Sequence, residues 1–175
     1  GDFKIVPIRY EDRLDIMKWR NEQMYHLRQD KPLTEKLQES YFNGTLARLF
    51  DHEKPNQILF SYLKNDKLIG YGGLVHINWI DKNAEISFLM NTELEKLYFS
   101  FLWKNFLELI EKVSFNDLTL KKIYTYAFDL RPQIYSIFEN SGFIKEAELK
   151  KHCYFNDEFR SVIIHSKFNK NFKIN

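Results

Sequence analysis

Apolar and polar residues alternate over several short stretches of the chain, which is the pattern of strands that bury one face. Four such stretches occupy the first half: Phe3 to Ile8, Gln57 to Lys64, Leu68 to Ile77 and Ala84 to Met90. Polar turns at Asn65-Asp66 and Asp81-Lys82-Asn83 separate the last three stretches from one another. We therefore expect these three to form an antiparallel meander.

Apolar residues three and four positions apart predict helices around these strands. We expect helices from Tyr10 to Asn21, from Pro32 onward, from about Lys96 to Val113, and between Pro132 and Gly142. Thr34 is placed to cap the second of them, because its hydroxyl can accept from a backbone amide in the first turn. Pro132 suits a first helical turn, and Gly142 suits the position just past a helix end.

The last third of the chain adds three strands to this pattern. We expect them from Lys122 to Phe128, from Glu146 to Phe155 and from Phe159 to Lys167, the last two joined at Asn156-Asp157. The resulting order is β-α-α-β-β-β-α-β-α-β-β, which predicts an α/β (α+β) fold with a mixed, largely antiparallel central sheet flanked by helices. The 175 residues contain no repeat and no Pro/Gly/Ser linker, so we expect a single domain over residues 1–175.

Charge and composition narrow the class of protein. The 26 Lys and Arg and the 24 Asp and Glu are spread along the chain, so no nucleic-acid partner is indicated. No apolar run approaches the roughly 20 residues of a membrane span, and no signal peptide is evident, which indicates a soluble cytoplasmic protein. The single Cys153 excludes an intramolecular disulfide, and the five His residues show no ligand spacing, so no metal site is expected.

Four segments carry a family resemblance through their order along the chain. They are WRN at Trp19 to Asn21, LIGYGGL at Leu68 to Leu74, AEISFLMNTEL at Ala84 to Leu94, and IYSIFENSGF ending at Phe143. In this order the chain resembles the GNAT acyltransferases over nearly its whole length. The resemblance is greatest to the branch that contains ribosomal-protein N-terminal acetyltransferases and amino-sugar acetyltransferases.

The resemblance implies that acetyl-CoA is the acyl donor and lies against the strands from Ala84 to Met90 and from Lys122 to Phe128. Its pyrophosphate would sit at the start of the main helix, where unpaired amides and the helix dipole stabilise an anion. The implied cofactor-binding residues are Phe88, Leu89, Met90, Leu94, Glu95, Lys96, Leu97, Tyr98, Phe99, Ser100 and Arg131, the last standing where the family has Asn.

The start of the main helix departs from the glycine pattern of the family. That pattern is Gln or Arg, two residues, Gly, one residue, then Gly or Ala, and it falls on Glu95, Tyr98 and Ser100. Ser100 alone is small enough to match. Cofactor binding therefore requires the Tyr98 ring to turn outward and leave the backbone amides accessible. The alternative is a plain strand–helix junction without a ligand.

Acyl transfer to an amine needs a base for the amine proton, and in several GNAT enzymes a carboxylate on the third meander strand supplies it. Glu85 occupies that strand and is the candidate base, unless it forms an outward-facing salt bridge. His76 is a second candidate base, or else a hydrogen-bonded structural residue. The usual acid, a Tyr, falls on Phe138 here, and Tyr135, one turn earlier, either replaces it or packs on the sheet edge.

The resemblance also implies an acceptor pocket around the first helix, where Trp19, Arg20, Asn21 and Arg28 gather. Arg20 or Arg28 could hold an anionic acceptor such as a nucleotide diphosphate through bidentate contacts. The alternative is that these charged residues form a solvated face.

The predicted function is the transfer of an acetyl group from acetyl-CoA to a primary amine by direct attack, with Cys153 as a packing residue. A nucleotide-linked amino sugar is the favoured acceptor, and a protein N-terminus or a small amine are the alternatives. A prediction of a different class is a non-catalytic binding or assembly module. The sequence leaves the oligomeric state open, a homodimer included.

Overall fold

The computed structural model describes residues 2–173. Their contacts divide the chain into two compact units. The first unit holds the residues up to 77 together with 87–99, and the second holds 78–86 together with the residues from 100 onward. Strand β4 (Asn83–Met90) and helix α4 (Thr92–Lys112) each contribute residues to both units. A single domain over residues 1–175 stays a prediction.

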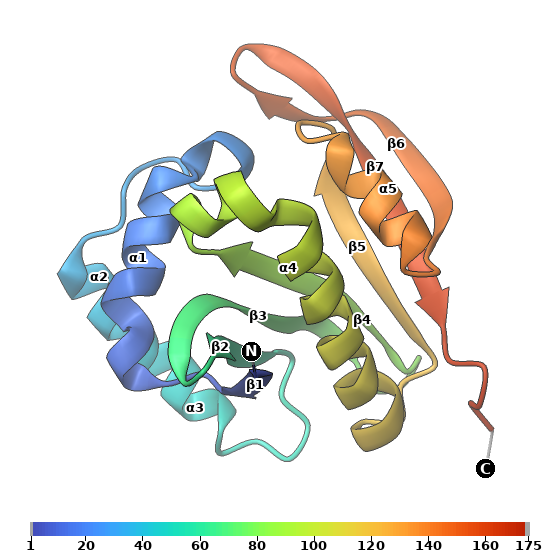
Figure 1. The fold of residues 1–175 in the computed structure, drawn as a ribbon, viewed down its shortest axis with the longest axis horizontal. Coiled ribbons are helices and arrows are strands. Elements are labelled where there is room, and N and C mark those ends of the chain that lie inside the picture. The colour runs from blue at the N-terminus through green and yellow to red at the C-terminus, as the bar shows by residue number, and fades with distance from the viewer. Residues whose placement is uncertain (1, 174–175) are drawn as a thin grey trace. The chain divides into compact units, whose positions relative to one another are not determined.

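Seven strands within the described residues form one sheet in the order β1-β2-β3-β4-β5-β7-β6 (Figure 1). Besides β4 these are β1 Phe3–Pro7, β2 Ile58–Lys64, β3 Lys67–Asn78, β5 Lys122–Phe128, β6 Ile144–Phe155 and β7 Glu158–Phe168. The β4–β5 pair is parallel, whereas β1–β2, β2–β3, β5–β7 and β6–β7 are antiparallel. The predicted mixed, largely antiparallel sheet is confirmed.

The helices follow the predicted order along the chain. They are α1 Arg13–Glu22, α2 Glu35–Ser40, α3 Ala47–Leu49, α4 and α5 Gln133–Asn140. A π-helical segment, Tyr41–Leu46, joins α2 to α3, so the predicted second helix is one helical stretch with a wider middle part. Thr34 caps this stretch as predicted, because its hydroxyl accepts from the Leu37 amide at 3.3 Å. Gly142 ends α5 with a φ of 83°, a conformation that glycine adopts freely.

The long helix α4 begins at Thr92, earlier than the predicted start near Lys96. The physical reason is a cap that the pattern of apolar residues does not reveal. The Asn91 side-chain oxygen accepts from the Glu93 amide at 3.0 Å and from the Leu94 amide at 3.1 Å. These bonds satisfy two of the amides that a helix start leaves unpaired, and so the helix begins directly after β4.

The first unit has a compact apolar core. Its buried cluster consists of Ile8, Ile16, Phe42, Leu46 and Leu59. Gly70 on β3 explains one glycine of the LIGYGGL segment, because a Cβ atom there would lie 2.9 Å from the Leu89 carbonyl oxygen on β4. Such a distance is too short for any side chain, so a residue without one is required where β3 approaches β4.

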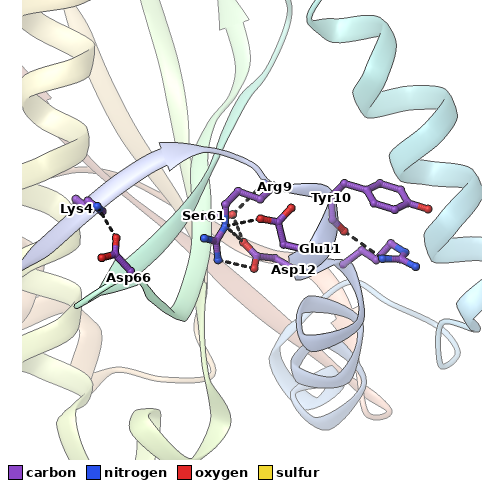
Figure 2. A network of polar contacts seen from close by, with 8 residues as sticks. Lys4, Arg9, Tyr10, Glu11, Asp12, Ser61 and Asp66 are labelled. Carbon is purple, nitrogen blue, oxygen red and sulfur yellow. Dashed lines mark hydrogen bonds and ion pairs between the residues drawn. The ribbon is translucent and has the colours of Figure 1, made fainter.

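A buried carboxylate fixes the start of α1 to strand β2 (Figure 2). Asp12, whose side chain is 6% exposed, accepts two hydrogen bonds from the Arg9 guanidinium, at 2.7 and 2.8 Å. The Ser61 hydroxyl donates to the same carboxylate at 2.6 Å and accepts from the Arg9 amide at 3.1 Å. A carboxylate buried to this degree is stable because each of its oxygens has a partner.

The second unit has its own core, formed by one face of α4 against buried residues of β5 and α5. Leu102, Phe106 and Ile110 are buried on α4, and Ile123 is buried on β5. Phe138 on α5 is only 1% exposed, and its ring meets the Trp103 ring edge-on with centroids 5.5 Å apart. The phenyl group that replaces the usual acid of the family is therefore a core residue here.

The Asp12 network predicts a measurable loss of stability when its charge is removed. Asp12→Asn should lower the free energy of unfolding by about 2 kcal/mol, because the Arg9 guanidinium loses its buried partner. Urea denaturation followed by circular dichroism measures this change. Asp66→Asn is the matched control, since Asp66 pairs with Lys4 at 2.6 Å on the surface and should show no measurable change. Equal effects of the two substitutions would contradict a structural role for Asp12.

Candidate functional site

Helix α4 is broken at Tyr98. The backbone of this residue has φ −133° and ψ 23°, outside the helical region, so α4 consists of two helical segments that meet at a kink. The Tyr98 side chain is 53% exposed, and Ser100, the small residue of the family pattern, is exposed two positions later. The break therefore lies at the position where the family pattern has its first glycine, and the ring is turned toward solvent.

Charged side chains before the break are engaged with one another or with neighbours in the first unit. The Lys96 ammonium pairs with Glu93 at 2.7 Å, and this hydrogen bond raises the pKa of Lys96. The Glu95 carboxylate, which stands where the family has Gln or Arg, accepts from the Tyr25 hydroxyl at 3.4 Å. Leu97 is largely exposed and Leu94 is half-buried.

The last residues of β4 have buried side chains. Phe88, Leu89 and Met90 are all buried in the core of the structure. The Phe88 ring meets the Tyr62 ring edge-on, with centroids 5.7 Å apart. Side chains held in this way fix the position of the strand within the first unit.

A buried glutamine that the sequence analysis did not single out holds the β4–α4 junction to α1. Gln23 is 1% exposed, and its amide nitrogen donates to the Met90 carbonyl at 2.8 Å and to the Thr92 hydroxyl at 3.1 Å. Its amide oxygen lies 3.2 Å from His26 Nε2, and the Thr92 hydroxyl donates to Glu22 at 2.5 Å. The signal in the sequence is its spacing, because Gln23 lies four residues after the buried Trp19.

The first unit also contains a cavity of about 480 Å³ bounded by α1, the α2 region and strands β2, β3 and β4. Six polar side chains line it: Arg20, Gln38, Tyr41, Gln57, Tyr71 and Ser87. The remaining lining residues are apolar. A concave apolar site with a few convergent polar groups is the usual form of a small-molecule site.

Arg20 is the charged group of this cavity. One of its terminal nitrogens donates to the Tyr71 hydroxyl at 2.8 Å, and its Nε donates to the Gln29 side-chain oxygen at 3.2 Å. The pKa of Arg20 is raised, chiefly by electrostatic interaction with the Tyr71 phenol, which outweighs the effect of burial. Burial raises the pKa of the neighbouring Tyr41. The guanidinium therefore stays charged and the Tyr41 phenol stays neutral near neutral pH.

The other predicted acceptor residues have different surroundings. Trp19 is buried, and Arg28 is exposed. The Asn21 side chain binds the chain leading to α2, because it donates to the Leu33 carbonyl at 2.9 Å and accepts from the Leu33 amide at 2.7 Å. Its oxygen also accepts from the Gln29 side-chain nitrogen Nε2 at 2.9 Å. Of the four residues predicted around the first helix, Arg20 is the one that lines the cavity.

The predicted bases lie on different strands. Glu85 on β4 is half-buried and faces Tyr124 in the parallel register with β5, and burial together with the Glu85 charge raises the pKa of Tyr124. Tyr124 was not among the predicted site residues, because the register of a parallel pair cannot be derived from the two strand sequences. His76 on β3 is exposed and has a φ of 49°, which is uncommon for a residue other than glycine.

The predicted acid, Tyr135, is engaged within the second unit. Its hydroxyl donates to Asp129 at 2.8 Å, and burial together with this hydrogen bond raises its pKa. Its ring stacks on His165 with centroids 5.4 Å apart. Arg131, the residue in the family's Asn position, accepts from the Ile134 amide through its backbone carbonyl at 3.0 Å, just before α5. In this arrangement the Tyr135 hydroxyl donates its hydrogen bond to a carboxylate, and with its raised pKa it is a weak acid.

A buried histidine lies beside Tyr135. His165 on β7 is fully buried, and its Nε2 is 3.5 Å from a Glu139 carboxylate oxygen. Within the described residues, neither of its ring nitrogens has a hydrogen-bond partner. Burial lowers the pKa of His165 and outweighs the opposing effect of Glu139. The imidazole is therefore favoured in its neutral form.

Residues 2–173 contain neither a candidate membrane-spanning helix nor a candidate metal-binding cluster. No helix there is both long enough and apolar enough to cross a membrane. In the same part of the chain, no group of three or more His, Cys, Asp or Glu side chains is arranged to hold a metal ion. Cys153 is buried on β6, with its sulfur 3.5 Å from the Arg160 carbonyl oxygen.

A family model described as acetyltransferase (GNAT) domain matches residues 5–162. The chain belongs to the GNAT acetyltransferase family. The predicted GNAT resemblance is thereby confirmed. A curated relative, the spermidine N(1)-acetyltransferase of Vibrio cholerae serotype O1, is 28% identical over 105 residues. The match covers 58% of this GNAT chain and 59% of the relative, so the chain spans about three fifths of the relative's length.

Solved structures support the same GNAT fold. A spermidine N-acetyltransferase from Vibrio cholerae in complex with CoA and spermine has a TM-score of 0.80 at 20% identity, with 97% of each chain covered. The spermidine/spermine N-acetyltransferase SpeG from the same organism, in complex with manganese ions, has a TM-score of 0.78 at 19% identity. That match covers 97% of this chain and 94% of SpeG. These relatives are named for polyamines, so they support the GNAT prediction without supporting its ribosomal-protein or amino-sugar branch.

The lowered pKa of His165 predicts a pH-dependent stability. Because the folded state disfavours the imidazolium, this contribution is complete above the unfolded pKa of about 6.5 and is lost as pH falls through the lower folded-state pKa. The melting temperature should therefore fall between about pH 7.5 and about pH 5.5, and His165→Gln should reduce that fall. His152→Gln, at an exposed histidine, is the control and should leave the fall unchanged. An unaltered fall in the His165 variant would contradict this assignment.

Proposed function

We propose that the chain transfers the acetyl group of acetyl-CoA to a small primary amine by direct attack of the amine on the thioester. The observation that carries this proposal is the break in α4 at Tyr98, with its ring exposed. A helical segment that starts after such a break presents backbone amides and a partial positive charge, both of which stabilise a pyrophosphate. Membership of the GNAT family supports the same cosubstrate.

The residues around the break fit the CoA assignment that the family implies. Ser100 is small and exposed, so its side chain does not obstruct an approaching diphosphate. The negative charge of Glu93 is partly balanced by its pair with Lys96. The segment Phe88 to Met90 lies directly before the helix, where the family resemblance places the pantetheine. CoA would supply the activated acyl group, and the chain's own residues bind and orient it.

The amine proton requires a base, and Glu85 is the proposed acceptor of that proton. As the amine nitrogen forms its bond to the thioester carbonyl carbon, it becomes positively charged and loses a proton to the carboxylate. The carbon–sulfur bond then breaks and the thiolate leaves. A thiolate scarcely needs protonation in the transition state, so a buried Phe138 and a Tyr135 hydroxyl bound to Asp129 are compatible with turnover.

The relatives support a small amine over the nucleotide-linked amino sugar that the sequence favoured. They are named as acetyltransferases of spermidine, a small polyamine. The glycine-free helix start supports the alternative of a non-catalytic GNAT module, which would keep the fold without turning over acetyl-CoA. Absence of CoA binding would exclude the enzyme, and turnover of acetyl-CoA would exclude the non-catalytic module.

Calorimetry with CoA tests the site at the break in α4. The unmodified chain should bind CoA, and Ser100→Asp should weaken binding by about tenfold or more, because a carboxylate would face the diphosphate. Ser136→Asp, the same change at an exposed serine of α5, is the matched control and should retain the affinity. No binding at millimolar CoA would exclude the proposed function.

Turnover of a panel of amines tests the role of Glu85. Glu85→Gln should lower kcat by about 10²-fold or more and leave the KM for acetyl-CoA nearly unchanged, as expected for loss of a general base. Glu108→Gln, at an exposed carboxylate of α4, serves as the control. If Glu85→Gln leaves kcat intact at every pH tested, Glu85 is not the base.

A further inference from the structure

Arg20 brings a positive charge into the cavity of the first unit without a carboxylate to balance it. Its partners, the Tyr71 hydroxyl and the Gln29 side-chain oxygen, are both uncharged groups. Within residues 2–173, no Asp or Glu lies within ion-pair distance of its guanidinium. None of the residues that line the cavity is acidic.

The Arg20 guanidinium has N–H donors that its two partners do not use. It carries five N–H donors in a fixed plane, and its two hydrogen bonds to Tyr71 and Gln29 use two of them. A partly buried charge is stable only when polar partners replace the lost water, and an anion is the strongest such partner. The two existing bonds also hold the side chain in one orientation, which reduces the entropy lost when a ligand binds.

The other residues that line the cavity indicate which groups the rest of the ligand carries. Its walls include Ile16, Phe42, Leu59 and Val75, which favour an apolar or aromatic group. Its volume of about 480 Å³ lies within the usual range for small-molecule sites. A polyamine would bring several positive charges toward Arg20 and would find no carboxylate among the lining residues.

The cavity extends to strand β4 next to the proposed pantetheine position. Ser87, one of its lining residues, directly precedes the segment Phe88 to Met90, along which the proposed function places the pantetheine of CoA. A ligand whose anionic group is held at Arg20 can therefore direct its opposite end toward that strand.

We propose that this cavity binds an amine acceptor through an anionic group, a carboxylate or a phosphate, carried at the end of the molecule remote from the amine. Arg20 binds that group and disfavours polyamines, so the chain differs in acceptor from the spermidine acetyltransferases that it resembles. The part concerning acetyl transfer rests on the proposed function, whereas the binding of the anionic group does not require it.

Three benzylamines of one shape provide a direct test. They are 4-(aminomethyl)benzoate, 4-methylbenzylamine and 1,4-bis(aminomethyl)benzene, which carry a negative, a neutral and a positive group opposite the same amine. In calorimetry without CoA, the affinity for the benzoate should be higher than that for the diamine by about tenfold or more. The corresponding 4-(aminomethyl)phenylphosphonate distinguishes a carboxylate site from a phosphate site by which of the two binds more tightly.

Variants on α1 assign the preference to Arg20. Arg20→Gln should remove the preference for the benzoate over the diamine, and Arg20→Lys should retain part of it, because the charge remains while the planar fork is lost. Lys18→Gln removes the same charge from an exposed position of the same helix and should leave the preference unchanged. Melting curves and CoA affinity show whether each variant is folded.

The outcomes separate this proposal from the proposed function. The anion site would be overturned if the diamine binds more tightly than the benzoate. It would also be overturned if the folded Arg20→Gln variant keeps the preference for the benzoate. Benzoate binding that depends on Arg20, in a chain that binds CoA but acetylates none of the amines, would support the anion site and count against acetyl transfer. If the chain acetylates the benzoate with a lower KM than the diamine, and Arg20→Gln removes this difference in KM, both the anion site and acetyl transfer are supported.

Discussion

The candidate cofactor site depends on one constraint: helix α4 does not run unbroken through Tyr98. In a continuous helix each amide donates to the carbonyl four residues earlier and is not available to a ligand. A residue with φ −133° and ψ 23° interrupts that series, and a helical segment starts anew beyond it. The GNAT pattern meets this need with glycine. Here a bulky residue leaves the helical conformation with its ring exposed, so the helix is interrupted without a glycine.

Buried polar contacts hold the residues before this break in place. Gln23 binds both the Met90 carbonyl and the Thr92 hydroxyl, and Asn91 caps the first turn of α4. Because Gln23 is fully buried, shifting the turn would leave its amide unpaired at a cost of about 1–3 kcal/mol. The Asp12 network anchors the other end of α1 to β2. Helix α1 thus holds Arg20, the cation of the cavity, and Gln23, which supports the β4–α4 junction, directly follows it.

Periodicity was sufficient to predict the strands and most of the helices, because these depend on which faces are apolar. The family was predicted from a resemblance in four sequence segments and their order. The site depends on details that periodicity does not carry. Arg20 and Asn21 are adjacent in the sequence, yet Arg20 lines the cavity while Asn21 is bound to the Leu33 backbone. Tyr98 is not a helix-breaking residue such as glycine or proline, so its residue type did not predict the kink. Tyr124 became visible only through its register with Glu85.

A crystal structure with CoA tests the central claim most directly. The account predicts pyrophosphate oxygens within hydrogen-bond distance of the backbone amides that follow Tyr98, with the Tyr98 ring remaining in solvent and the kink preserved. A structure in which α4 is straight through Tyr98, or in which the ring covers those amides and the pyrophosphate lies elsewhere, would contradict it.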